Sequence, residues 1–185
     1  MVKHRLLEYT VPPLDIVHIG IVGLGNRGMK AVGRYELVPG AEIVALADHK
    51  ESSTITANRT LIMSGRPEAH TYFGNQAHVL LVQDSAVDLV YVCTDWRSHV
   101  PLAVMAMRSG KHVAIEVPAA MTTDECRELI DVSLETGRHC VMLENCCYDT
   151  FASATREMVN KGLLGEVTHC EGAYIHDLNQ DVAAL

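Results

Sequence analysis

The sequence Gly23-Leu-Gly25-Asn-Arg-Gly28, at the end of an apolar run, is the feature that most constrains the fold of this chain. This G-x-G-x-x-G follows a predicted strand, 15–22, and opens a predicted helix, 27–37. In a strand–turn–helix unit, Gly23 permits the tight turn, Gly25 lets a pyrophosphate approach the backbone, and Gly28 lets the helix pack close to the strand. Backbone N–H groups at the helix start would then bind phosphate oxygens.

Asp48 supports the same interpretation, because it ends the second apolar run about 20 residues after Gly28. A carboxylate at this spacing would bind the adenosine ribose hydroxyls and repel a 2′-phosphate, which favours NAD over NADP. The neighbouring His49 and Lys50 leave NADP open. The alternative is a glycine turn without a ligand, with Asp48 as a helix N-cap.

Apolar strands alternate with helical segments along the first 143 residues. The predicted strands are almost continuous in Val, Ile, Leu and Ala, as in strands that are buried on both faces. They cover 15–22, 41–47, 87–93, 112–116 and 139–143, and the helices between them cover 27–37, 50–64, 100–109 and 123–136. This alternation predicts an α/β fold, a Rossmann-type doubly wound parallel sheet.

The pattern changes after Leu143. A helix is predicted over 151–160, and the segment from Val167 to Tyr174 is predicted to be a more polar strand. Because one strand cannot form a sheet, we expect the start of a truncated second α+β domain. The expected boundaries are 1–148 for an NAD-binding Rossmann domain and 149–185 for a connecting helix and first strand of an incomplete substrate domain.

Composition excludes several classes of protein. A net charge of −8 disfavours a nucleic-acid-binding surface. The apolar runs are shorter than the roughly 18 to 20 residues of a membrane span, and no secretory signal is visible, so a cytoplasmic location is expected. The six cysteines are interpreted as buried, reduced thiols rather than metal ligands or a redox pair, and the ten histidines are scattered, so no metal site is predicted.

Polar residues gather where three predicted strands end. The clusters are Cys93–His99, Glu116–Pro118 and Glu144–Tyr148. The carboxyl ends of parallel strands form the ligand-binding edge of such sheets, so these clusters, including Thr94, are expected to meet there around a ligand. Individually, His99 and Asn145 could equally be loop or capping residues.

Four segments resemble the glucose–fructose oxidoreductase / inositol dehydrogenase (Gfo/Idh/MocA) family. They are "IGIVGLGNRG", "TDWRSH", "KHVAIEVP" and "MLENCCY". Typical members have Glu-Lys-Pro where this chain has Glu116-Val117-Pro118, and their lysine assists proton transfer at the hydroxyl that is oxidised. Val117 has no group that could do so.

Four other segments resemble a narrower branch, glycoside hydrolase family 109, the NAD-dependent α-N-acetylgalactosaminidases. They are "EVPAA", "MLENCCYD", "KGLLGEV" and "EGAYIHDL". The resemblance implies that Tyr174 touches the sugar, with Tyr148 and His176 as candidates for acid–base roles. It also implies a set of NAD contacts: Asn26, Arg27, Asp48, Trp96, Arg97, Ser98, His99, Glu116, Val117 and Asn145.

The implied reaction is glycoside cleavage through transient oxidation at C3 of the sugar, elimination across C1 and C2, and addition of water. Two alternatives remain: a sugar or cyclitol dehydrogenase with another proton carrier, and a non-catalytic NAD-binding module. The expected partners are a small-molecule or glycan substrate and, through the second domain, another copy of the chain.

Overall fold

The computed structural model describes residues 10–35, 37–173 and 175. Its elements are β1 (Val17–Val22), α2 (Asn26–Tyr35), β2 (Ala41–Asp48), α3 (Glu51–Met63), β3 (His70–Phe73), α4 (Ala77–Gln83), β4 (Leu89–Val92), α5 (Trp96–Arg108), β5 (His112–Ile115), α6 (Thr123–Thr136), β6 (Cys140–Met142), the 3₁₀ helix η1 (Asn145–Tyr148) and α7 (Thr150–Asn160). Within these described ranges, no helix is both long and apolar enough to cross a membrane.

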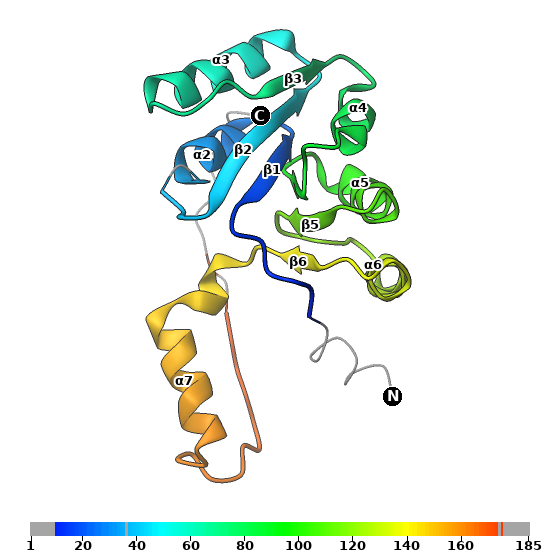
Figure 1. Ribbon diagram of the computed structural model, residues 1–185. Helices are drawn as coiled ribbons and strands as arrows, with labels where there is room; N and C mark the ends of the chain where they lie inside the picture. The colour runs from blue at the N-terminus through cyan, green and yellow to red at the C-terminus, as the bar shows by residue number, and fades with distance from the viewer. Residues whose placement is uncertain (1–9, 36, 174, 176–185) are drawn as a thin grey trace. The chain divides into compact units, whose positions relative to one another are not determined.

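Six parallel strands form one sheet in the order β3-β2-β1-β4-β5-β6 (Figure 1). The chain winds outward from β1 to β3, returns to the middle at β4, and winds outward again to β6. The strand order therefore reverses between β1 and β4, where ligands bind in sheets of this kind. The predicted Rossmann-type doubly wound parallel sheet is confirmed.

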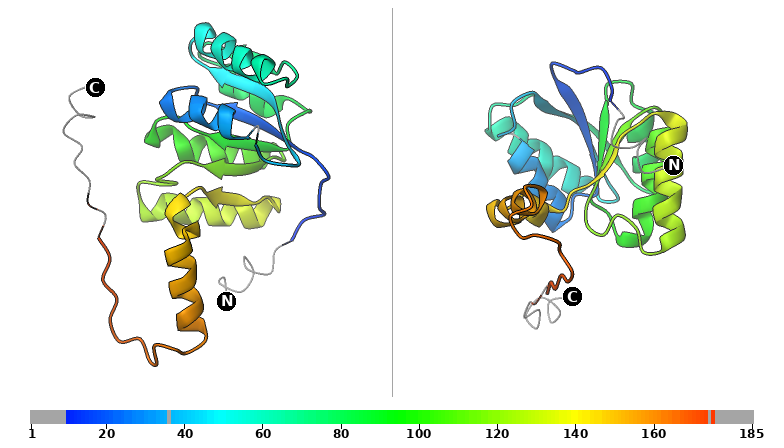
Figure 2. Two further views of the ribbon diagram at one scale, coloured as in Figure 1. Left: turned by 90° about the vertical axis from the view of Figure 1, so that its left-hand side faces the viewer. Right: turned by 90° about the horizontal axis from the view of Figure 1, so that it is seen from below.

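Helices cover both faces of the sheet, and each face has its own apolar core. Val32 of α2 and Leu61 of α3 are buried in one core. Leu81 of α4, Met107 of α5 and Leu129 of α6 are buried in the other. The view from below in Figure 2 separates the blue and teal helices of the first face from the green and yellow helices of the second. Burial on both faces explains why the central strands are almost continuously apolar.

Three elements were missing from the sequence prediction: β3, α4 and the 3₁₀ helix η1. β3 is a short edge strand, and most of its residues are exposed, so it lacks the apolar run by which the inner strands were found. α4 has only seven residues, too few for a helical period to stand out. Asn58 of α3 fixes the approach to β3, since its amide donates to the Ala69 carbonyl at 2.9 Å and accepts from the Ala69 N–H at 2.9 Å.

α5 begins earlier than the predicted start at Val100. Asp95 is its N-cap, and its carboxylate accepts from the Arg97 N–H at 3.1 Å and from the Ser98 hydroxyl at 2.6 Å. Proline is usually confined to the first turn of a helix, but Pro101 lies inside this one. Trp96, Arg97, Ser98 and His99 are therefore helical.

The chain divides into two compact units, Met1–Leu143 and Glu144–Leu185. The second unit contains η1 and α7, and neither has a buried residue. The strand predicted from Val167 is not formed: residues 167–173 and 175 have no strand geometry, and those residues are exposed. The prediction was wrong because a strand is defined by hydrogen bonds to a neighbour, and the described part of this unit offers no neighbouring strand.

Candidate functional site

A groove of about 460 Å³ lies at the carboxyl ends of β1, β2 and β4. It therefore coincides with the reversal point of the sheet, where a nucleotide is expected. Its lining comes from the ends of those strands, the loops that follow them, α4 and the first turns of α5: Val22, Gly23, Gly25, Ala47, Asp48, His49, Gly74, Ala77, His78, Cys93, Thr94, Asp95, Arg97, Ser98, Pro101, Leu102 and Met105.

The glycine turn explains why this edge can accept a ligand. Gly23 has φ +92°, and an added Cβ would lie 2.6 Å from the Cys93 carbonyl oxygen. At Gly28 a Cβ would lie 2.0 Å from the Gly23 carbonyl oxygen, so only glycine allows α2 to pack this closely. Gly25 differs, because a Cβ there would meet nothing within 4 Å. The space above Gly25 is open, as a backbone that binds a diphosphate requires.

Asp48 connects the glycine turn to the end of β2. One carboxylate oxygen accepts from the Leu24 N–H at 2.8 Å, and the other accepts from the Lys50 N–H at 2.8 Å. Both bonds hold the carboxylate at the groove wall. A carboxylate has about four acceptor positions in total. Acceptor capacity therefore remains for the ribose hydroxyls that the spacing predicted.

Glu116 follows β5 and is buried, with 8% of its surface exposed. Its Oε1 accepts from Arg27 Nε at 2.8 Å and from the Tyr91 hydroxyl. Tyr91 is 1% exposed and packs edge-on against Tyr35 with ring centroids 5.5 Å apart. The carboxylate that the sequence predicted as a coenzyme contact is thus bonded to two side chains of the protein.

The charge on Glu116 is maintained by these neighbours. Burial by itself raises the pKa of a carboxyl group, but the hydrogen bonds from Arg27 and Tyr91 outweigh burial and keep the pKa of Glu116 below its usual value. The Glu116 hydrogen bond in turn raises the pKa of Arg27. Tyr91 is kept neutral, since burial and the bond to Glu116 raise its pKa. The site therefore holds an ion pair between a buried carboxylate and a half-exposed guanidinium, with a neutral phenol beside it.

His99 lies beneath the same edge and is 1% exposed. Its Nδ1 is 2.8 Å from the Pro118 carbonyl oxygen, and its Nε2 is 3.1 Å from the Thr94 carbonyl oxygen. The ring therefore connects the loop after β4 to the loop after β5. The cofactor contact expected of His99 is not apparent, because almost none of the residue is open to a ligand.

The other predicted contacts of the first unit are distributed along the edge. Thr94, Arg97 and Ser98 line the groove. Trp96 is 59% exposed and Val117 is 39% exposed, and neither lines the groove. Asn26, like Arg27, lies in the first turn of α2. The structure thus brings together the glycine turn, Asp48 and the residues at the start of α5.

The remaining candidate residues belong to the second unit or lie outside the residues that the structure describes. Asn145 and Tyr148 are both in η1 and exposed, and Asn145 Nδ2 is 3.7 Å from the Cys146 sulfur. Tyr174 and His176 lie outside the described residues. The roles implied for these four residues therefore stay predictions.

Sequence reasoning missed several residues of the groove. Gly74, Ala77 and His78 reach it from β3 and α4, two of the elements that the pattern did not reveal. Cys93 belongs to the first predicted cluster and does line the groove; burial raises the pKa of its thiol to about 12, so it is an uncharged wall residue rather than a nucleophile. Tyr91 gave no signal in the sequence, because it looks like any aromatic residue of a buried strand.

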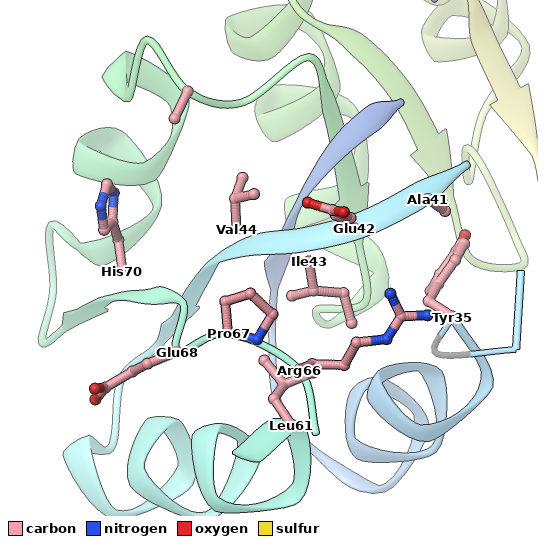
Figure 3. Close-up of a pocket in the computed structure, with 11 residues that line it drawn as sticks. Tyr35, Ala41, Glu42, Ile43, Val44, Leu61, Arg66, Pro67, Glu68 and His70 are labelled. Atoms are coloured by element: carbon pink, nitrogen blue, oxygen red, sulfur yellow. The ribbon is translucent and has the colours of Figure 1, made fainter. Parts of the chain in front are cut away.

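A smaller cavity of about 210 Å³ lies near the amino end of β2 (Figure 3). Its lining includes Tyr35, Glu42, Arg66 and His70, and the Arg66 guanidinium reaches toward Tyr35. The amino ends of parallel strands lie on the side of the sheet opposite to their carboxyl ends, so this cavity is separate from the groove beside Asp48.

The residues of the groove fit a dinucleotide. An open glycine turn at the start of a helix provides N–H donors for a diphosphate, and Asp48 provides an acceptor for ribose hydroxyls. The groove is lined mostly by small or apolar residues, as the faces of a nucleoside require.

Comparison with known proteins gives the same assignment. Residues 17–144 match the model of an oxidoreductase family with an NAD-binding Rossmann fold. Among solved structures, an aldose-aldose oxidoreductase from Caulobacter crescentus is 25% identical with a TM-score of 0.69, over 81% of this chain and 44% of that chain. An NAD-binding protein from Listeria innocua is 25% identical with a TM-score of 0.66, over 81% of this chain and 42% of that chain.

Curated relatives are more similar in sequence. Glycosyl hydrolase family 109 protein 2 of Phocaeicola vulgatus is 48% identical over 97% of this chain and 44% of its own length. An alpha-N-acetylgalactosaminidase of Bacteroides fragilis is 48% identical over 94% of this chain and 41% of its own length. The chain therefore spans about two fifths of the length of these relatives.

Proposed function

The chain belongs to the Gfo/Idh/MocA oxidoreductase family, whose NAD-binding Rossmann fold it contains, and we propose that it is the coenzyme-binding part of an NAD-dependent glycosidase. The proposed substrate is a glycan with a terminal N-acetylgalactosamine. The observation that carries the proposal is the 48% identity, over 94% of the chain, to a relative named alpha-N-acetylgalactosaminidase.

Val117 supports a reaction other than plain dehydrogenation. It follows Glu116 at the end of β5 and is 39% exposed. An alcohol dehydrogenation needs a group that takes the hydroxyl proton, and a valine side chain cannot accept one. The resemblance places a lysine at this position in ordinary members of the family. A dehydrogenase would have to provide its base from elsewhere.

The proposed reaction is a net hydrolysis. Bound NAD would supply a hydride acceptor for C3 and later return the hydride, so no NADH is released. Between these events a ketone at C3 makes the C2 proton acidic. Loss of that proton and of the C1 substituent leaves an unsaturated ketone. Water then adds at C1, C2 regains a proton, and C3 is reduced again.

Within this proposal the chain's residues have separate tasks. Asp48 and the glycine turn hold the coenzyme, and the first residues of α5 line its groove. Tyr148 and His176 are proposed for proton transfer, and Tyr174 for contact with the sugar. A phenol acts as a base near neutral pH only when its pKa lies below the usual value of about 10.

The test measures whether the proton at C2 of the sugar exchanges with solvent during cleavage. A polypeptide of the relatives' length that contains this chain should cleave an aryl N-acetylgalactosaminide in heavy water and place deuterium at C2 of the product. NADH should not accumulate during turnover. Accumulation of NADH with free sugar would indicate the dehydrogenase instead. NAD binding without either reaction would indicate a non-catalytic module, and cleavage without deuterium at C2 would exclude the redox route.

A further inference from the structure

The hydrogen bonds of Glu116 suggest a role that differs from direct coenzyme contact. Its side chain is 11% exposed, and its Oε1 already accepts from Arg27 and from Tyr91. Tyr91 is itself buried. A carboxylate with so little surface, and with two donors on one oxygen, has little to offer a ligand directly.

Arg27 is the open member of this group. Its side chain is 46% exposed, and only its Nε is used by Glu116, at 2.8 Å. Among the described residues, Nη1 and Nη2 donate to no other group. A guanidinium holds its donors in one rigid plane, so an arginine bonded through Nε can still present its terminal N–H groups to an anion.

The position of Arg27 identifies the anion. It is the second residue of α2 and follows Gly25, which lines the groove. The amino end of the first helix is where a dinucleotide diphosphate binds in this fold. The diphosphate is therefore the nearest anionic group of a bound coenzyme.

We propose that Glu116 is a positioning residue: it holds the guanidinium of Arg27 so that the terminal N–H groups of Arg27 bind the diphosphate of NAD. Glu116 thus contributes to coenzyme affinity through Arg27 and not by touching NAD. A restrained side chain loses less rotamer freedom when the ligand arrives. This inference rests on the NAD-binding fold of the family and is independent of the glycosidase proposal.

A double-mutant cycle separates the two roles of Glu116. Dissociation constants for NAD are measured by calorimetry on the parent chain, Arg27→Gln, Glu116→Gln and the double variant. Arg27→Gln should weaken NAD by about tenfold, as loss of a charge-assisted contact does. Glu116→Gln should produce part of that loss in the parent. In the Arg27→Gln background it should change the affinity by less than about twofold.

Three controls accompany the cycle. ADP-ribose, which has the diphosphate, should follow NAD, whereas adenosine should bind all variants equally. Arg34→Gln removes one positive charge from an exposed position in the last turn of the same helix and should leave NAD affinity unchanged. Tyr91→Phe removes the other donor to Glu116 without changing Arg27, and should weaken NAD less than Arg27→Gln does.

A spectroscopic readout distinguishes positioning from general support of the fold. The Arg27 Nε–H resonance should be protected from solvent exchange in the parent and lose that protection in Glu116→Gln. If Glu116→Gln does not fold, Arg27→Lys at this half-exposed position still tests the proposal. Lysine keeps the positive charge but lacks the planar set of N–H donors of a guanidinium. It should weaken NAD by several-fold.

Two results would overturn the proposal. An equal loss of affinity from Glu116→Gln in both backgrounds would mean that Glu116 contacts the coenzyme itself. Unchanged NAD affinity in Arg27→Gln and Arg27→Lys would mean that the ion pair serves only the fold.

Discussion

The two units of the chain differ in how their residues are buried. In Met1–Leu143, side chains such as Leu81 and Ile115 are completely inaccessible, and helices cover both faces of the sheet. In the second unit, η1 and α7 have no buried residue, and Phe151 and Leu163 are 84% and 66% exposed. The comparison shows that a segment can form a helix without contributing to a buried core, since α7 is helical but has no buried residue.

Hydrogen exchange should show the largest difference between the units. Amides of β1 and β4 should exchange at least about a thousandfold more slowly than those of α7, because core amides open only with the whole fold and exposed helices open locally. Exchange followed by NMR at neutral pH measures both in one sample. Equal protection in α7 and β4 would mean that the second unit is stabilised by contacts equivalent to a core.

Matched leucine substitutions should give the next largest effect. Leu81 is 0% exposed and Leu163 is 66% exposed. Leu81→Ala should lower the free energy of unfolding by about 2 to 5 kcal/mol, because it leaves a cavity in the core. Leu163→Ala should change it by no more than about 0.5 kcal/mol. Urea denaturation measures both, and a large effect of Leu163→Ala would contradict the comparison.

NAD binding by the first unit should depend on Asp48. Asp48→Ala removes a charged hydrogen-bond acceptor, worth roughly 1.5 to 3 kcal/mol, so NAD should bind about tenfold more weakly or worse. The parent should prefer NAD to NADP, and the variant should lose that preference. Asp124→Ala, at an 88% exposed side chain of α6, is the control for charge. Equal affinities of the parent for NAD and NADP, measured by calorimetry, would refute the role of Asp48.

Acid should produce the smallest effect, through Glu116 of the first unit. The pKa of Glu116 is lowered in the folded chain, because the bonds from Arg27 and Tyr91 outweigh burial. Its contribution to stability is therefore complete above the unfolded value of about 4.3 and is lost as the pH falls through the lower folded value. The stability difference between the parent and Glu116→Gln should therefore shrink as the pH falls below about 4.3.

The exposed pair of α7 provides the comparison for this titration. Glu157 Oε1 and Lys161 Nζ are 3.0 Å apart, and both side chains are more than half exposed. Such pairs contribute little, so Glu157→Gln should differ from the parent by only a small amount. A difference for Glu116→Gln that stays constant as the pH falls would show that its ion pair does not contribute to folding.

Much of the fold could be predicted because strands, helices and their caps leave signals within short stretches of sequence. The inner strands are recognised by their apolar runs. α6 is recognised by the capping box of Thr122 and Glu125 at its start and by the left-handed Gly137 at its end. β3 and α4 could not be predicted, since an exposed edge strand and a seven-residue helix have no such signature. The strand expected after Val167 had the expected sequence pattern but is not formed, because a strand needs a neighbouring strand to bond to.

The candidate site divides in the same way. The glycine turn and Asp48 were found from spacing, because residues on both sides of one βαβ unit have a fixed geometric relation. The groove residues from α4 were missed along with the helix. His99 was predicted as a cofactor contact, and its burial beneath two loops could not be inferred, because its partners Thr94 and Pro118 are backbone carbonyls that leave no trace in the sequence.

By itself the sequence determined a parallel sheet with a coenzyme turn after β1, because strand and helix periods and the need for glycine are properties of short segments. Only the tertiary structure decided what Glu116 does. Arg27 and Glu116 are 89 residues apart, and their bond exists because parallel pairing sets the ends of β1, β4 and β5 side by side. A charge placed at a strand end can be read from a sequence, but the group that it faces depends on the order and register of the strands.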